Sequence, residues 1–359
     1  MKNNHHKDKI ERLFLKTDLN FSPNLSLRIN HSAAYAHNIA YLRAIENQLL
    51  ISDPLTEYFR DIISKLEIID SHLDNLILKI APLVFSNGNI IDFSREFPIE
   101  MKNYLRAKKI INQVLILLGV NKEFLVPITI GKKILLNSNQ IKKIISASEE
   151  MEIIFNNLWE FFSKISLPKT IKTVELLALS ENRDKFISSR GKQFCISNTF
   201  SYLIRNRKDS GYQLEKNEYL VGPIARLNIN KIDRKANDNI KKTNPKISIN
   251  NLFEIIPGRI IESQNLLFDI LEKILNYKES IKTKVSSFTE IGVCNSSDGI
   301  IIYRVKLEQN NRRIKEIQII DDCDQNSLAI EIFLKEIKKT SKEDFLFKTK
   351  LLRSAFNLE

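Results

Sequence analysis

Cysteine is scarce in this chain of 359 residues, which contains three, and no two of them form a CxxC pair. Cys195, Cys294 and Cys323 lie too far apart for the disulfide framework of a small secreted domain, and they favour a reducing compartment. No apolar run reaches the roughly 18 residues of a membrane-spanning helix. The charged start, MKNNHHKDKIERLFLK, lacks the apolar stretch of a signal peptide. We therefore expect a cytoplasmic protein without a membrane span.

The motifs of several enzyme classes are missing as well. The chain has no GxxxxGK(S/T), GxGxxG, HExxH or GxSxG, so nucleotide, dinucleotide, zinc-protease and serine-hydrolase chemistry have no support. The acidic run at residues 321–324 lacks the glycine and the spaced oxygen donors of an EF-hand. We expect a surface turn there rather than a cation site.

Positive charge exceeds negative charge, with 55 Lys and Arg against 43 Asp and Glu, a formal net charge of +12. This excess permits attraction to nucleic acid, anionic lipid or an acidic protein. The lysines are spread along the chain, which favours a biased composition over a dedicated polyanion site. The densest stretch, NKIDRKANDNIKKTNPK at residues 230–246, has almost no apolar side chain and predicts a solvated basic loop, with an anion-binding arm as the alternative.

Helical periodicity dominates the sequence. Apolar residues recur at helical spacing over residues 33–50 and 55–80, with a proline between the two patterns, which predicts two antiparallel helices. Further helical patterns cover residues 100–118, 138–165 and 259–277. Between residues 138 and 192 only helical pattern is apparent.

Strand signals cluster late in the chain. Residues 300–320 contain two β-branched runs around an Asn-rich turn, which predicts a hairpin. A further helix should follow, with Asn326 or Ser327 as its cap.

Three segments carry a family pattern, in family order and at roughly family spacing. VGPIARLN, residues 221–228, is similar to a VGPLARxN signature and follows an SYL segment. GRIIESQNLL places Arg259 and Glu262 as in an Arg-x-x-Glu helix. GIIIYRVKLEQNNRRIKEIQIIDDCDQNSLAIE is similar to the hairpin and Gln-Asn turn that follow an EAPRG motif. Together they resemble the large subunits of nickel-iron hydrogenases.

The stretch RINHSAAYAHNIAYLRAIE resembles the segment in which that family carries R-x-C-G-x-C followed by histidine. Arg28, His37 and Glu46 match family positions. Asn30 and Ala33 stand where the family has its first two cysteines. The CGxC has become NHSA.

Other family motifs are altered too. NSSDG replaces EAPRG, with Asn295 in place of Glu and Asp298 in place of Arg, and the sequence stops at LLRSAFNLE, where DPCxxC would be reached. Thiolates hold such metals because they are strong anionic donors, which alanine and asparagine do not replace. The resemblance therefore implies no nickel-iron centre and no other metal or cofactor. It implies a vestigial pocket made of Arg28, Asn30, Ala33, His37, Glu46, Arg226, Asn295 and Asp298.

The histidines near these positions do not suggest a replacement metal site. His31 and His37 are six residues apart, so they do not share one helical face. We expect His37 to be a hydrogen-bonded pocket residue and His31 to belong to the turn. His72 should satisfy a buried polar position between helices. The three cysteines should be buried or edge-of-core thiols.

The resemblance implies a mainly α fold with a small β portion (α+β), a hydrogenase large-subunit-like helical bundle whose N-terminal sheet is shortened or missing. One domain should cover residues 28–359 after a tail or short lead-in at residues 1–27. The implied function is non-catalytic: a pseudoenzyme that acts in hydrogenase assembly or maturation as a scaffold or accessory protein, with maturation proteins as partners.

Three alternatives stay open. The first is a structural subunit docked on an iron-sulfur small subunit, as in respiratory complex I, whose large subunit is a relative that has also lost its cysteines. The second is an enzyme with new chemistry in the emptied pocket, built from His37, Glu46, Arg226 and Asp298. The third is nucleic-acid binding through the basic loop, which would weaken steeply with salt.

Overall fold

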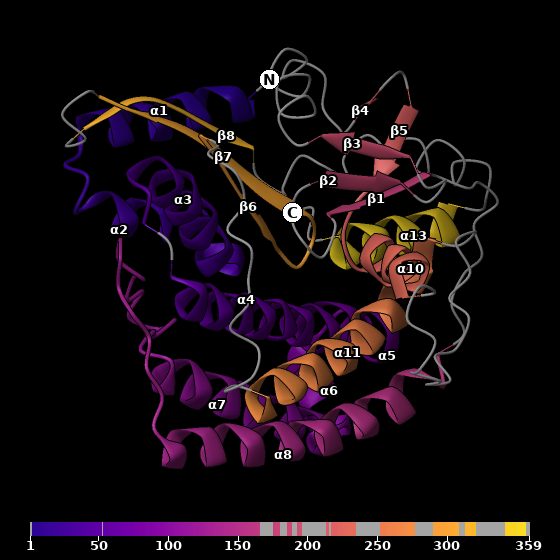
Figure 1. Cartoon of the computed structure of the whole chain (residues 1–359). Helices are drawn as coiled ribbons and strands as arrows, with labels where there is room; N and C mark the ends of the chain where they lie inside the picture. Colours follow the sequence, from indigo (N-terminus) through magenta and orange to yellow (C-terminus); the bar gives the residue numbers. More distant parts are fainter. Residues whose placement is uncertain are drawn as a thin grey trace.

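The computed structural model describes residues 2–51, 53–165, 175–179, 185–188, 192–195, 213–214, 217–234, 252–276, 290–308, 313–320 and 342–356. Helices dominate these residues and two small sheets complete the fold, which is mainly α with a small β portion, as the sequence predicts (Figure 1). Within these residues, no single helix has the length and hydropathy of a membrane span. One bent pair, Pro54–Phe85 with Ile90–Glu96, reaches them only when its two parts are taken together.

The elements that the structure describes have the following bounds. The helices are α1 (Lys2–Lys16), α2 (Ser22–Ser26), α3 (Ala34–Leu49), α4 (Pro54–Asp74), α5 (Ala81–Phe85), α6 (Ile90–Glu96), α7 (Pro98–Leu117), α8 (Ser138–Phe162), α10 (Pro223–Arg234), α11 (Ile255–Leu275) and α13 (Lys342–Ala355), with short 3-10 turns η1 (His31–Ala33) and η3 (Leu252–Glu254) and a π-helix η2 (Asn75–Ile80). The strands are β1 (Glu175–Leu179), β2 (Lys185–Ser188), β3 (Gln193–Cys195), β4 (Gln213–Leu214), β5 (Asn217–Leu220), β6 (Ile291–Asn295), β7 (Ile300–Leu307) and β8 (Ile314–Ile320).

Local sequence signals explain where the main helices begin and end. Helix α3 is closed by Leu50, the residue after its last turn, whose φ of 56° lies in the left-handed region that ends helices. Pro54 then opens α4 at its first position, where a proline lacks no hydrogen bond that the helix needs. Helix α8 starts at a capping box in which Asn137 and Gln140 exchange hydrogen bonds. The predicted antiparallel pair is confirmed as α3 and α4.

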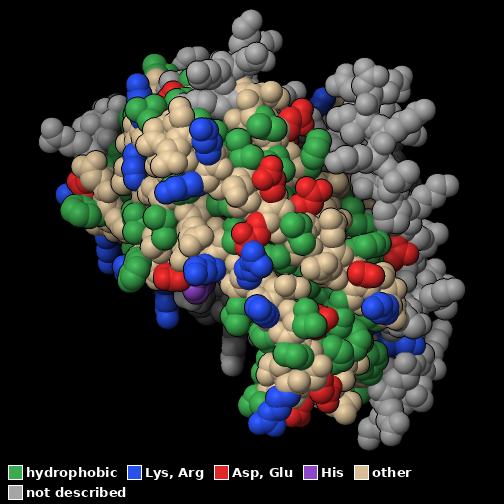
Figure 2. Space-filling model, turned by 90° about the horizontal axis from the view of Figure 1, so that it is seen from below, with side chains coloured by type: hydrophobic (Ala, Val, Ile, Leu, Met, Phe, Trp, Pro, Cys, Tyr) green, Lys and Arg blue, Asp and Glu red, His purple; other side chains and the backbone are tan. Residues whose placement is uncertain are grey.

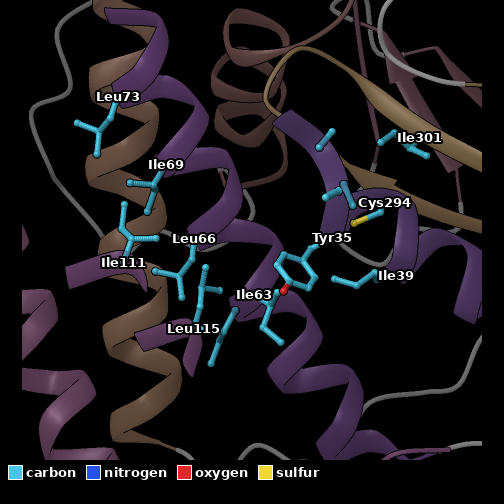
Figure 3. Close-up of a cluster of buried hydrophobic side chains, with 14 of the residues drawn as sticks. Tyr35, Ile39, Ile63, Leu66, Ile69, Leu73, Ile111, Leu115, Cys294 and Ile301 are labelled. Atoms are coloured by element: carbon cyan, nitrogen blue, oxygen red, sulfur yellow. The ribbon is translucent and has the colours of Figure 1, made fainter. Parts of the chain in front are cut away.

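The core lies between α4 and the helices that pack on it. Apolar residues at helical spacing on α4 contact residues on α7 (Figure 3). Tyr35 and Ile39 of α3 extend the cluster toward the sheet made of β6, β7 and β8. The α4 and α7 members labelled in Figure 3 are Ile63, Leu66, Ile69, Leu73, Ile111 and Leu115. At about 25 cal/mol per Å² of apolar surface removed from water, such burial is the main stabilising contribution to the fold.

Two sheets are present among the described residues. The first has five strands in the order β3-β2-β1-β5-β4, in which β1 and β5 run parallel. The second is antiparallel, in the order β6-β7-β8. The predicted hairpin at residues 300–320 is confirmed as β7 and β8. The expectation of helix alone between residues 138 and 192 is wrong, because β1 and β2 lie there. They pair with each other, and β1 also pairs with β5.

The three-stranded sheet is held by side chains of flanking helices. Strand β6 lies so close to α3 that a Cβ on Gly292 would overlap the backbone oxygen of Ala40. Beyond the end of β6, the Gln48 amide continues the pairing of β7, since its Nε2 donates to Val305 O (2.7 Å) and its Oε1 accepts from Leu307 N (3.1 Å). On β8, Glu11 Oε1 accepts from Ile319 N (3.0 Å).

Some expected segments have a different structure, and others lie outside the described residues. Residues 2–27, expected as a tail or lead-in, form α1 and α2, and α1 packs on β8. Residues 230–234 of the predicted basic loop belong to α10, and residues 235–246 lie outside the described residues. The turn at 321–324 and the helix capped at Asn326 or Ser327 also lie outside them.

Candidate functional site

Four elements distant in sequence meet at a buried ionic network: α4, α10, α11 and the turn between β6 and β7. At its centre, Glu262 of α11 accepts two hydrogen bonds from Arg226 of α10, from Nε at 2.6 Å and from Nη2 at 2.9 Å. His72 of α4 completes this side, with Nε2 2.8 Å from Glu262 Oε2. All three side chains are buried, so the bonds form out of contact with water, where they are strong.

The protonation of His72 follows from its two partners. Its Nδ1 lies 2.8 Å from Arg259 Nη1, and a guanidinium can only donate. Nδ1 must therefore accept, and Nε2 carries the proton that it donates to Glu262. Burial, together with the nearby Arg259 charge, lowers the pKa of His72 to about 4. Burial alone would raise the pKa of Glu262, but Arg226 and the His72 donor outweigh it and hold that pKa at about 2.

Arg259 links the network to the β6–β7 turn and to the last turn of α13. Its Nη2 donates to Asp298 and to the backbone oxygen of Ala355 (2.6 Å). Asp298 also accepts from Ser297 Oγ (2.8 Å). Arg226 donates to the backbone oxygens of Ser297 (3.0 Å) and Gly299 (3.3 Å). The turn is thus fixed from both arginines.

The network balances its own charge. Two guanidinium groups, Arg226 and Arg259, face two carboxylates, Glu262 and Asp298, and His72 is neutral at pH 7. A buried pair of this kind is stable only when most of its remaining donors and acceptors are hydrogen-bonded. The contacts above provide these bonds except at Arg259 Nε, which has no hydrogen-bond partner among the described residues. The arrangement is suited to holding α4, α10, α11, α13 and the β6–β7 turn in register.

A second buried cluster has a carboxylate of α4 at its centre and lies against the start of α3. Glu67 of α4 accepts from the backbone N–H groups of Tyr35 and Ala36, each at 2.7 Å. Burial raises the pKa of Glu67 to about 7, against the lowering effect of Lys122 and the two N–H donors. Lys122 itself binds Asp70 at 2.6 Å. This cluster fixes the N-terminus of α3 on α4.

A third cluster lies further along α3. Glu46 accepts two hydrogen bonds from Arg60 of α4 (2.5 and 2.8 Å) and one from the backbone N–H of Gly131 (2.8 Å). The pair is nearly inaccessible to solvent. Its role is to join α3, α4 and the segment before α8.

Sequence comparisons find no relative. No protein-family model matches the chain. No curated protein sequence matches it.

Solved structures match the chain over 97% of its length. An NAD+-reducing nickel-iron hydrogenase in its H2-reduced state matches with a TM-score of 0.71, at 14% identity and over 89% of that chain. A nickel-iron-selenium hydrogenase of Dm. baculatum, purified anaerobically and crystallised under air, matches with a TM-score of 0.61, at 12% identity and over 90% of its chain. A reduced, active form of the enzyme from Desulfomicrobium baculatum gives 0.58 at 10% identity. The chain has the fold of a nickel-iron hydrogenase large subunit. Likeness at this identity carries the fold and not the activity.

The large-subunit-like fold brings together only some of the residues expected to form a vestigial pocket. Arg226 and Asp298 belong to the ionic network, bridged by Arg259 and the turn. The Asn295 backbone oxygen accepts from Ser64 Oγ at 3.3 Å, at the end of β6. His37 is buried with its Nδ1 3.0 Å from Tyr303 OH, which confirms it as a hydrogen-bonded residue.

The remaining pocket candidates lie apart from the ionic network. Glu46 binds Arg60, as described above. Arg28 is exposed. Asn30 caps η1, since its Oδ1 accepts from Ser32 N (3.1 Å) and Oγ (2.8 Å), and Ala33 is buried beside it. The eight candidates therefore do not converge on a single site.

The described residues do not offer the thiolates that hold a nickel-iron centre in the hydrogenase family. Ala33 offers a methyl group and the Asn30 oxygen is already bonded at its turn. Cys294 is buried on β6 beside Ser64, Cys195 is exposed on β3 in the other sheet, and Cys323 lies outside the described residues. Within the described part of the chain, no group of three or more His, Cys, Asp or Glu side chains is arranged to hold a metal ion.

The surface of the described residues shows no basic stripe on the face seen from below, where Lys and Arg are mixed with Asp, Glu and hydrophobic side chains (Figure 2).

The predicted role of His72 is confirmed, since it is a buried polar residue between helices. The sequence analysis missed Arg60 and Glu67, although a charged residue on the apolar side of a predicted helix was a usable signal.

Proposed function

We propose that this chain is a non-catalytic large-subunit-like protein that acts in hydrogenase assembly or maturation, as a scaffold or accessory protein. Maturation proteins would be its partners, in the reducing compartment that the scattered cysteines favour. The proposal requires the large-subunit fold without its metal chemistry.

One observation carries the proposal: the ionic network around Glu262 commits the polar side chains that could otherwise serve chemistry. Its members come from the segments that resemble the family motifs, Arg226 from VGPIARLN, Arg259 and Glu262 from the Arg-x-x-Glu helix, and Asp298 from NSSDG. Each is bonded to another member, so the charge is neutralised internally. A substrate or metal would have to displace these bonds, which is unfavourable in a buried site.

The second candidate is a structural subunit docked on an iron-sulfur small subunit. The matched hydrogenase structures favour it, because the chain keeps their fold over almost its whole length. The exposed Arg28 at the entry to α3 is available for such a contact. An enzyme built from His37, Glu46, Arg226 and Asp298 has less support, since these residues do not converge on one point.

The test is elemental analysis for nickel, iron and zinc on the chain purified from its native host, together with whatever co-purifies. We expect no stoichiometric nickel in this chain, with iron and sulfide only in a partner. Stoichiometric nickel bound to this chain would overturn the proposal. A stable complex with an iron-sulfur small subunit would select the second candidate.

A deletion strain separates the two roles further. Loss of this chain should lower the nickel content and activity of a separate hydrogenase large subunit in the same host if it serves maturation. An unchanged metal content of that large subunit, with loss of an assembled complex instead, would indicate the structural role. A hydrogenase that is neither depleted of metal nor disassembled would contradict both.

A further inference from the structure

The start of α3 is capped by a side chain from another helix. The first backbone N–H groups of a helix need acceptors from outside it, and the N-cap residue of α3, Ala33, provides no side-chain hydrogen bond. Glu67 of α4 supplies the acceptors, because its Oε1 accepts from Tyr35 N and its Oε2 from Ala36 N, each at 2.7 Å. Both oxygens of one carboxylate are therefore needed to hold the first turn of α3.

This carboxylate is buried without a cation of its own. Glu67 is 2% exposed, and it forms no ion pair with another residue that the structure describes. The two nearby lysines bind Asp70 instead, Lys108 at 2.5 Å and Lys122 at 2.6 Å. Burial without a direct partner favours the neutral form of a carboxyl group, because it removes the water that stabilises the ionised form.

The other polar groups on this side of α4 are bonded elsewhere. Asp74 of α4 accepts from Lys108 at 2.8 Å and from the Tyr104 hydroxyl of α7 at 2.9 Å. The Tyr35 hydroxyl of α3 donates to Val126 O at 3.1 Å. In η1, His31 is exposed to solvent.

The charged residues of α11 lie against a different side of α4. They bond to His72, Lys65 and Asp61, which are turned away from Glu67 by helical geometry. These residues of α11 are Arg259, Glu262, Asp269 and Lys273. No cation from α11 therefore compensates the charge of Glu67 directly.

An opening of the first turn of α3 would hydrate this carboxylate. Tyr35 and Ala36 are fully buried, so water that reaches either N–H group also reaches the oxygen bonded to it. In the closed form, burial raises the pKa of Glu67 to about 7, against the lowering effect of Lys122 and the two N–H donors. In water the pKa returns to its ordinary 4.5. The closed form is therefore favoured below pH 4.5 and loses stability relative to the open form as pH rises to 7.

We propose that Glu67 is a proton-controlled latch on the start of α3. When it is protonated, it keeps the first turn of the helix closed, and when it is ionised, it favours an opening of this turn in which water reaches the carboxylate. The turn follows η1 and the exposed Arg28 and His31, so the latch would make this part of the surface sensitive to pH. It does not depend on the proposed function.

Amide hydrogen exchange, measured by NMR on the full chain, tests the latch. The protection factor of an amide excludes the pH dependence of the exchange chemistry itself. Between pH 5 and pH 7 the protection factors of Tyr35 and Ala36 should fall on the order of 30-fold, because the closed form binds one more proton than the open form over most of this interval.

The Gly131 amide is the reference within the same chain. It is also held by a buried carboxylate, that of Glu46, but this carboxylate has Arg60 as its direct partner. Its protection factor should show no comparable fall. A fall shared by Gly131 would indicate unfolding of the whole domain and would overturn the local latch.

Two variants change the latch in a matched way. Glu67→Gln keeps the size of the side chain and one acceptor but cannot ionise, so the protection factor of Tyr35 should no longer depend on pH. Asp70→Asn releases Lys108 and Lys122 to pair with Glu67, which favours the ionised form in the closed state and should reduce the fall.

Infrared difference spectra between pH 8 and pH 6 observe the proton directly. The wild type should show the carbonyl stretch of a protonated carboxyl group at pH 6, and Glu67→Gln should lack it. The latch would be overturned if this band were absent from the wild type. It would also be overturned by equal pH dependence of protection in the wild type and Glu67→Gln, or by protection at Tyr35 that rises with pH.

Discussion

Two buried regions share helix α4 and differ in how they hold their neighbours. Toward α7, Leu66 and Ile69 make apolar contacts that have no fixed direction (Figure 3). Toward α11, His72 makes two directional bonds, one to Glu262 and one to Arg259. Apolar contacts tolerate a change of shape, whereas a buried ionic bond that loses one partner leaves a charge without compensation. The comparison predicts that mutations in the second region are far more costly.

The largest effect should come from Arg259→Met. This change removes the arginine donor from Asp298, which keeps only its bond from Ser297 Oγ, and from the Ala355 oxygen and His72. The buried carboxylate then lacks a balancing charge, so the free energy of unfolding should fall by about 3–5 kcal/mol. Urea denaturation measures it. Arg259→Lys keeps the positive charge but not the several N–H donors of the guanidinium group. Its free energy of unfolding should lie between those of the wild type and Arg259→Met. A loss below about 1 kcal/mol for Arg259→Met would show that the network adds no more than the apolar cluster.

Acid should destabilise the network before the apolar cluster. The pKa of His72 is held at about 4, below its ordinary 6.5, so the neutral form contributes stability above pH 6.5 that is lost as pH falls toward 4. At about 1.4 kcal/mol for each pKa unit, the loss is on the order of 3 kcal/mol. The pKa of Glu262, held at about 2, adds a further loss below pH 4.5.

Glu67, whose pKa is raised to about 7, gains stability as pH falls from 7 toward 4.5 and contributes a slope of opposite sign. The effect of His72 is therefore measured as the difference between the wild type and His72→Gln in unfolding free energies between pH 8 and pH 4. His72→Gln, which removes the titrating ring, should lose less stability than the wild type between pH 6.5 and pH 4.5. The same slope in the wild type and in His72→Gln would place its origin elsewhere in the protein.

On the apolar side, Ile69→Val should lower the free energy of unfolding by about 1 kcal/mol, because it removes one buried methylene and leaves a small cavity. The same denaturation series measures it. A loss as large as that of Arg259→Met would remove the distinction between the two regions.

The smallest effect should come from Arg28→Ala. Arg28 is exposed and belongs to neither buried region, so the change in unfolding free energy should stay within about 0.5 kcal/mol. Thermal unfolding is sufficient to test this. A larger loss would mean that Arg28 has a structural role that its exposure does not indicate.

The sequence predicted the parts of the fold that rest on local signals. Apolar periodicity located α3 and α4, and the β-branched runs located β7 and β8. Strands β1 and β2 were not predicted, because they are short and lack an alternating pattern. Strand β1 also pairs in parallel with β5, some forty residues further on. Such pairing leaves no trace in a local window.

The candidate site was predictable only in part, for the same reason. Spacing placed Arg259 and Glu262 on one helix, one turn apart. It did not reveal that His72 would lie between them, or that Asp298 would balance Arg259. These contacts join residues separated by more than 35 positions, and they depend on how α4, α10 and α11 pack.

The Gln48 amide that continues β7 has a consequence for solubility. An unpaired strand edge offers a row of donors and acceptors to any other chain, and it is a common start of aggregation. By bonding Val305 O and Leu307 N, Gln48 blocks that row from within the molecule. Gln48→Leu would expose it, and we expect the first visible result to be self-association at high concentration, with the fold itself intact.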